Sequence, residues 1–118
     1  MSLKLRNPKG FTLVEVIVVA VIVAVLAAVA IPLYLNYVNN SKTNACENAA
    51  GSAASFCGAC KAAAGTVADN DYGPNSTITC TGPGTTMIVP ANITVTIKTG
   101  VVTAKHADGQ TSGNHPYQ

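Results

Sequence analysis

The chain has 118 residues, with seven Lys and Arg against five Asp and Glu, so its formal net charge is +2. This length suits a single domain and excludes a multi-domain enzyme. Hydrophobic residues make up 48% of the sequence, which excludes a chain kept disordered by low hydrophobicity and high net charge. A net charge of +2 gives no support to nucleic-acid binding through a basic patch.

The sequence starts with a short basic segment that leads into a long apolar one. Residues 1–10 hold three basic residues and no acidic residue, and residues 11–35 are almost entirely apolar. A helix crosses a membrane with about 20 apolar residues, so residues 11–35 predict a membrane-spanning helix. A secretory signal peptide is the alternative, but its apolar part is typically only ~7–15 residues long.

Glu15 is the one charged residue in this apolar segment. An acidic side chain at membrane depth costs roughly 2.5–3.5 kcal/mol on insertion scales, which makes Glu15 a candidate functional residue. The alternative is that Glu15 lies shallow enough to reach the lipid headgroups. The next basic residue is Lys42, so no cationic partner lies nearby in the same segment. We therefore expect Glu15 to find its partner in a neighbouring molecule.

The sequence KGFTLVE at residues 9–15 resembles the prepilin processing motif of type IV pilins and type II secretion pseudopilins. The resemblance extends from residue 1 to about residue 40. It implies a leader peptide at residues 1–10, which prepilin peptidase removes by cutting between Gly10 and Phe11. It also implies that the same enzyme N-methylates Phe11, and that Glu15 pairs with the amino terminus of a neighbouring subunit.

The chemistry of the segment agrees with this resemblance. Cleavage after Gly10 creates an ammonium group at Phe11. At an effective dielectric constant of 20, opposite charges 4 Å apart attract by ~4 kcal/mol before desolvation, which is comparable to the insertion cost of Glu15. Pro32 corresponds to the helix-kinking proline of the family, and its missing N–H predicts a kink or a local opening.

A helical pattern continues beyond the apolar segment. Small apolar residues recur at spacings of three and four, which marks one helix face, and they are Cys46, Ala49, Ala53, Cys57, Cys60 and Ala64. We expect one helix from Thr12 to about Ala64, about 80 Å long at 1.5 Å per residue. Gly65 is the predicted C-cap.

Short strands are expected after the helix. Residues 93–98 alternate between apolar and polar side chains, and a turn at Thr99 and Gly100 leads into residues 101–106, which predicts an antiparallel hairpin. Weaker strand candidates are residues 76–81 and 85–89. Loops are expected where Gly, Pro, Asn and Asp gather, over residues 69–75, 81–84 and 108–116.

These elements predict an α+β fold in which a long N-terminal helix, membrane-spanning and then amphipathic, packs on an antiparallel sheet of three or four strands, as in type IV pilins. The leader would occupy residues 1–10 and the transmembrane and filament-core helix residues 11–35. A soluble head would follow at residues 36–118. It would combine the second half of the helix, residues 36–64, with the loops and sheet of residues 65–118.

All four cysteines lie in the expected head, namely Cys46, Cys57, Cys60 and Cys80. In a small exported domain they imply two disulfides. Along an unbroken helix, Cys46 and Cys57 are ~16 Å apart, and Cα atoms more than ~7 Å apart cannot be joined by a disulfide. Cys57 and Cys60 are one helical turn apart and within reach, which favours the pairs Cys46–Cys80 and Cys57–Cys60. A break in the helix would allow other pairings. The pattern around the cysteines supports neither a redox motif nor a zinc site, so no metal or cofactor is expected.

The resemblance implies a structural protein and not an enzyme. We expect the subunit of a type IV pilus-like filament, held first as a single-pass protein in the bacterial inner membrane among lipids. The inner-membrane pilus assembly machinery would then build it into an extracellular homo-oligomer used for adhesion, motility or surface attachment. Alternatives are a type II secretion pseudopilin and a competence pilus subunit for DNA uptake, although no specific nucleic-acid partner is predicted. An alternative of another class is a small membrane-anchored or secreted binding protein with disulfides.

Overall fold

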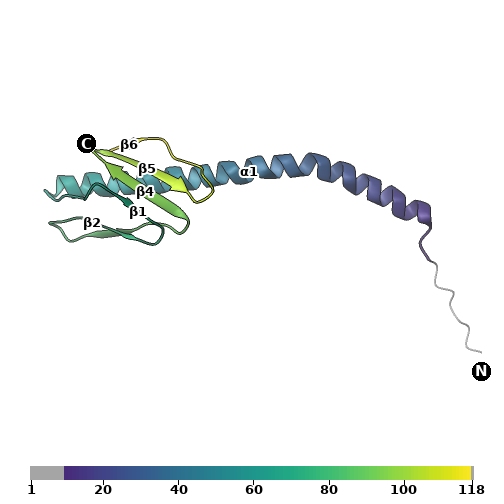
Figure 1. Cartoon of the computed structure of the whole chain (residues 1–118), viewed down its shortest axis with the longest axis horizontal. Helices are drawn as coiled ribbons and strands as arrows, with labels where there is room; N and C mark the ends of the chain where they lie inside the picture. Colours follow the sequence, from purple (N-terminus) through teal and green to yellow (C-terminus); the bar gives the residue numbers. More distant parts are fainter. Residues whose placement is uncertain (1–9, 118) are drawn as a thin grey trace, which may run out of the picture. The chain divides into compact units, whose positions relative to one another are not determined.

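The computed structural model describes residues 10–117, which form one long helix followed by six strands (Figure 1). The helix α1 spans Leu13–Ala62. The strands are β1 (Asn70–Tyr72), β2 (Thr77–Thr79), β3 (Thr86–Ile88), β4 (Ile93–Lys98), β5 (Val101–His106) and β6 (His115–Pro116). The chain divides into an N-terminal unit that ends at Asn36 and a C-terminal unit that begins at Tyr37, and α1 belongs to both. The predicted α+β fold class is confirmed.

The long helix is confirmed, with ends at Leu13 and Ala62 where the sequence predicted Thr12 and Ala64. It includes Pro32 and is unbroken at both of its glycines. Its first half is rich in Val and Ile, which have only modest helix propensity in water. A membrane removes the competition from water for backbone hydrogen bonds, so an apolar segment of this composition satisfies its N–H and C=O groups by forming a helix.

The helix ends in a Schellman motif in which Ala64 is the left-handed residue. Ala64 has a φ of 57°. Its N–H donates to the Lys61 carbonyl at 3.0 Å, and the Gly65 N–H donates to the Cys60 carbonyl at 2.9 Å. These two bonds satisfy carbonyls that the last helical turn leaves open. The predicted capping role of Gly65 is therefore wrong by one residue.

Gly65 is required for a different reason, which is the close approach of the next chain segment. A Cβ atom at this position would lie 2.6 Å from the Cys80 Sγ, 2.7 Å from the Thr81 carbonyl oxygen and 2.8 Å from the Pro83 Cδ. Gly65 is also buried. The missing side chain lets the end of α1 lie directly against the segment that carries Cys80.

A four-stranded antiparallel sheet of order β1-β4-β5-β6 forms one layer of the C-terminal unit. Its centre is the β4–β5 hairpin, which confirms the strands predicted over residues 93–98 and 101–106. The two loop residues, Thr99 and Gly100, have φ values of 44° and 83°. Positive φ at both positions matches the twist of a two-residue hairpin.

Two strands lie in segments predicted as loops. β1 pairs with β4 within residues 69–75, and β6 pairs with β5 within residues 108–116. Both are very short and lack alternating burial, so the composition of a loop hides them. The weaker candidates at residues 76–81 and 85–89 do form strands, but β2 and β3 pair with each other in a separate two-stranded sheet.

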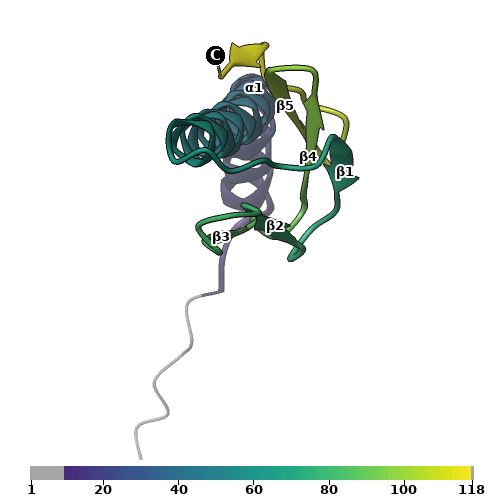
Figure 2. The same ribbon diagram turned by 90° about the vertical axis from the view of Figure 1, so that its left-hand side faces the viewer.

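The core of the C-terminal unit lies between one face of α1 and the strands. In Figure 2 the sheet strands β4 and β5 lie along one side of the teal end of α1, and β2 and β3 lie along another. The buried residues of the helix are all Ala and Cys, which lets the strands approach closely. The predicted helix face is confirmed except for Ala64, which has left the helix and is exposed. The core residues are Cys46, Ala49, Ala50, Ala53, Ala54, Cys57, Ile78, Val89, Ile93, Val95, Ile97, Val102 and Ala104.

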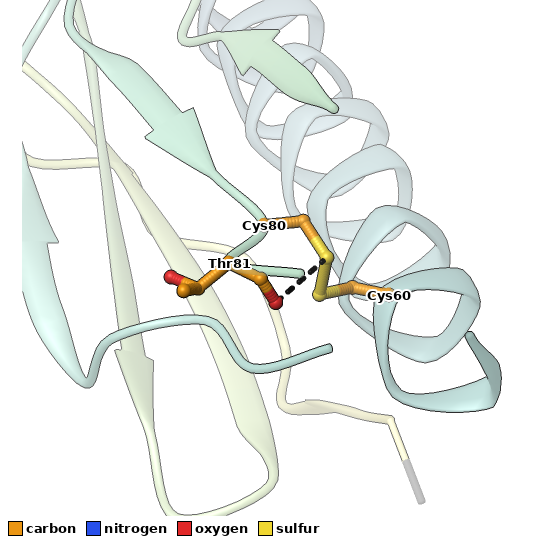
Figure 3. Close-up of a disulfide and its surroundings, with 3 residues drawn as sticks. All are labelled: Cys60, Cys80 and Thr81. Atoms are coloured by element: carbon orange, nitrogen blue, oxygen red, sulfur yellow. Dashed lines mark hydrogen bonds between the residues drawn. A yellow bond between two sulfur atoms is a disulfide. The ribbon is translucent and has the colours of Figure 1, made fainter. Parts of the chain in front are cut away.

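One disulfide joins the last turn of α1 to the residue that follows β2, linking Cys60 to Cys80 with a Cα–Cα distance of 5.7 Å (Figure 3). The expected pairs Cys46–Cys80 and Cys57–Cys60 are therefore wrong, and Cys46 and Cys57 are buried thiols. The position of Cys80 in the fold explains the correction, because Cys80 lies beside the last turn of α1. Cys46 lies about 21 Å before Cys60 along the helix axis at 1.5 Å per residue, so Cys80 reaches only the end of the helix.

Candidate processing and assembly site

The predicted cleavage junction lies just before the helix. Gly10 and Phe11 belong to no helix or strand, and Phe11 is 86% exposed. Among the described residues, and apart from its neighbours in the chain, nothing lies within 4 Å of the position that a Gly10 Cβ would occupy. A protease binds its substrate with peptide groups free to hydrogen-bond, as in strand addition. The geometry at this junction therefore leaves the bond between Gly10 and Phe11 open to an enzyme.

Thr12 and Glu15 form a capping box that fixes where the helix begins. The Glu15 N–H donates to the Thr12 Oγ1 at 3.3 Å, and the Thr12 N–H donates to the Glu15 Oε2 at 3.3 Å. The Thr12 hydroxyl also lies 3.2 Å from the same carboxylate oxygen. These reciprocal bonds satisfy donors that an α-helix leaves open at its first turn. They explain why α1 begins at Leu13.

The capping box identifies Thr12 as a functional residue that the sequence reasoning missed. The signal was present, because a Thr followed three residues later by a Glu ahead of an apolar run is the sequence pattern of a capping box. Glu15 thus has local hydrogen-bond donors in its own chain. Among the ion pairs of residues 10–117, however, none involves Glu15.

The N-terminal half of α1 presents a continuous apolar surface. From Phe11 to Tyr37, every large apolar side chain is exposed by 50% to 86%. Within the described residues, α1 is the one helix long and apolar enough to cross a membrane. An exposed apolar surface of this extent marks contact with lipid or with another protein.

Pro32 lies inside this apolar half without ending the helix. Because proline has no N–H, the Ala28 carbonyl lacks the bond that residue 32 would otherwise donate. The kink assigned to Pro32 from the family resemblance stays a prediction.

The cysteines outside the disulfide are placed as buried thiols. Cys46 and Cys57 are 0% and 1% exposed, and burial raises the pKa of both. A raised pKa suppresses the thiolate, which is the form that attacks disulfides and binds metals. Within residues 10–117, no group of three or more His, Cys, Asp or Glu side chains is placed to hold a metal ion.

Comparison with known proteins agrees with the geometry of the N-terminal segment. The model of the prokaryotic N-terminal methylation motif matches residues 5–31. The match includes the junction at Gly10 and Phe11, the capping box and most of the apolar helix, and it ends just before Pro32. No curated protein and no solved structure matches the chain significantly. Residues 5–31 therefore carry the prepilin-type signature of type IV pilins and pseudopilins.

Proposed function

We propose that this chain is a structural subunit of a type IV pilus-like extracellular filament. The observation that carries the proposal is the prepilin-type motif, which leads directly into a helix with large apolar side chains exposed by at least 50%. Such a surface is stable only in lipid or against other apolar surfaces. Before assembly, a single-pass position in the bacterial inner membrane would bury this apolar surface in lipid. After assembly, the helices in the filament core would bury it against one another.

Processing is the first step of the proposal. Prepilin peptidase would cut between Gly10 and Phe11 and N-methylate the new terminus at Phe11. The exposed, non-helical junction supports this step, because the enzyme need not unwind α1 to reach it. Before cleavage, the three basic residues of residues 1–10 would hold the leader on the cytoplasmic side of the membrane. After cleavage, four basic and five acidic residues remain, so the excess of basic over acidic residues in the precursor comes from its leader.

Assembly would use the carboxylate of Glu15. Cleavage leaves an ammonium group on Phe11, and at 4 Å and an effective dielectric constant of 20 this group attracts a carboxylate by ~4 kcal/mol. The capping box uses the Glu15 Oε2. The other oxygen, Oε1, accepts no hydrogen bond from residues 10–117 and is available to the Phe11 ammonium of a neighbouring subunit. This pairing would set the register of the apolar helices in the filament.

The C-terminal unit would face solvent on the filament surface, where adhesion, motility or surface attachment are the roles that we propose for it. Its disulfide suits an oxidising, exported setting. A pseudopilin would share all of these features. Uptake of DNA has less support, because Lys42 is bound by Asp108 and only Lys61, Lys98 and Lys105 remain as unpaired cations in the C-terminal unit's described residues.

Filament formation tests the proposal. In the bacterium that produces the chain, sheared surface fractions should contain filaments built from it. Glu15→Val should leave leader cleavage intact and reduce filament yield strongly, because the carboxylate that would pair with the Phe11 ammonium is lost. Asp71→Asn, which removes an exposed carboxylate on β1, should leave the yield unchanged. A processed wild-type chain that never leaves the membrane would contradict the filament, and normal filaments from Glu15→Val would contradict the pairing.

A further inference from the structure

Residues 107–115, which we call the C-terminal strap, leave the end of β5 and run back along the C-terminal half of α1. Three polar anchors join the strap to the helix. The Asp108 carboxylate pairs with the Lys42 ammonium, and the Gln110 Nε2 donates to the Asn39 Oδ1 at 3.4 Å. The third anchor is Glu47, which binds the far end of the strap.

Glu47 uses both of its carboxylate oxygens in this anchor. The Gly113 N–H donates to its Oε1 at 2.6 Å, and the His115 Nε2 lies 2.7 Å from its Oε2. These bonds lower the pKa of Glu47, with the Gly113 N–H as the largest cause and His115 as the next. The hydrogen bond from Lys42 likewise lowers the pKa of Asp108. Both anchors thus depend on ionised carboxylates.

The strap adheres to α1 through polar groups alone. None of residues 107–115 belongs to the apolar core, whereas β4 buries Ile93, Val95 and Ile97 in it. On its other side the strap is bonded to β5 through the backbone, as by the Ser112 N–H to the Ala104 carbonyl at 2.8 Å. Those backbone bonds do not titrate. Loss of the two carboxylate charges would therefore leave only the bonds of Gln110 to Asn39 and Cys46, at 3.4 and 3.5 Å, between the strap and α1, while the bonds to β5 stay intact.

The strap contacts the thiol of Cys46, at the edge where this core residue meets Gln110. Cys46 is 0% exposed, and its Sγ donates to the Gln110 carbonyl at 3.5 Å. Cys57 is 1% exposed and borders a cavity at a different place, which Lys61, Val67 and Tyr117 also line. The two thiols therefore report on different parts of the same unit.

We propose that residues 107–115 are an acid-sensitive strap, which releases α1 and uncovers the Cys46 thiol when Glu47 and Asp108 take up protons. The folded-state pKa of each carboxyl is lowered, so the contribution to stability is present above their ordinary values of 4.5 and 3.8 and is lost as pH falls through the folded pKa. The other titratable groups at the anchors are Lys42, His106, His115 and Cys46. Lys and protonated His only strengthen the pairs, so release requires protonation of the carboxyls themselves.

Thiol labelling of the full chain in detergent micelles tests the strap. Cys57→Ser leaves Cys46 as the one free thiol, and Cys46→Ser leaves Cys57. Each is treated with 4,4′-dithiodipyridine from pH 7 to pH 3, with rates divided by those of a small thiol at the same pH. The Cys46 rate should rise about tenfold or more below pH 4, as expected for the loss of charge-assisted hydrogen bonds. The Cys57 rate should stay constant.

Two outcomes would refute the proposed acid-sensitive release of the strap. Cys46 could stay protected at pH 3, or both thiols could become reactive together, which is general unfolding. A second test uses amide hydrogen exchange at pH 7 on the chain with all its cysteines. Glu47→Gln combined with Asp108→Asn should speed exchange about tenfold at the Gly113 N–H, the strap amide that donates to Glu47, while the control Asp71→Asn should not. Unchanged exchange in the double variant would also refute the proposal.

Discussion

The packing of Gly65 against the disulfide gives a sharp test of how the C-terminal unit is built. Gly65→Ala places a Cβ within 2.8 Å of the Cys80 Sγ, the Thr81 carbonyl oxygen and the Pro83 Cδ. Overpacking of this kind costs ~1–3 kcal/mol, and we expect the upper half of that range because two of the three contacts are with a backbone oxygen and a bridged sulfur. No flexible side-chain end can move aside.

The chain supplies matched controls for this substitution. Gly51 and Gly58 lie inside α1, and a Cβ at either position would meet no atom within 4 Å. Gly51→Ala and Gly58→Ala make the same chemical change, and each should stabilise by about 1 kcal/mol through helix propensity. Comparing the three variants therefore separates the cost of the close contacts at residue 65 from the general preference of helices for alanine over glycine.

Thermal unfolding of the full chain in micelles, followed by the near-UV circular dichroism of its tyrosines, measures the effect. One kcal/mol corresponds to a Tm change of about 4–8 °C in a domain of this size. Gly65→Ala should lower Tm by roughly 8–24 °C, and Gly51→Ala should raise it by about 4–8 °C. A Gly65→Ala variant as stable as Gly51→Ala would refute the proposed approach of the helix end to Cys80.

Three further predictions follow from other contacts. Thr12→Ala should destabilise the start of α1 by about 1 kcal/mol, seen as faster hydrogen exchange in its first turn, and Thr12→Ser should not; equal exchange would count against the capping box. Replacing Cys60 and Cys80 together by Ala should cost ~3 kcal/mol in denaturant unfolding, since their bridge closes a separation of 20 residues; an unchanged midpoint would argue against the bridge. Stability of the C-terminal unit should fall as pH drops below about 4.5, because Glu47 and Asp108 have lowered pKa values; a denaturation midpoint that stays constant down to pH 3 would disprove this.

The sequence alone was sufficient to predict the features that depend on a local pattern of residues. The apolar run predicts the first half of α1, the spacing of Ala and Cys predicts its buried face, and the alternation over residues 93–98 predicts β4. The hairpin turn at Thr99 and Gly100 was also predictable. Each of these features depends on side chains close together in the chain, with a period that matches one secondary structure.

The features that were mispredicted depend on contacts between distant segments. The partner of Cys80 is decided by which turn of α1 lies opposite the end of β2, and no spacing in the sequence specifies this. Gly65 has the position of a C-cap, but the approach of Cys80 is what excludes a side chain there. The strands β1 and β6 are held by the edges of the central hairpin, and their own composition is that of loops.

The functional residues also fall into two groups, those that the local sequence predicts and those that only the fold brings together. Gly10, Phe11 and Glu15 follow from the motif, and the capping bonds of Thr12 could have been expected from its spacing to Glu15. The anchors of the strap could not, because Glu47 and its partner Gly113 are 66 residues apart. Their proximity is a product of the fold and has no counterpart in the local sequence.

The mass of the mature N-terminus shows directly whether the chain is processed as a prepilin. Protein purified from the membrane and from sheared surface fractions would be analysed by intact-mass and N-terminal peptide mass spectrometry. We expect a chain that begins at Phe11, with one methyl group on its amino nitrogen and residues 1–10 absent. A chain that keeps its leader, or that begins at any residue other than Phe11, would contradict this expectation.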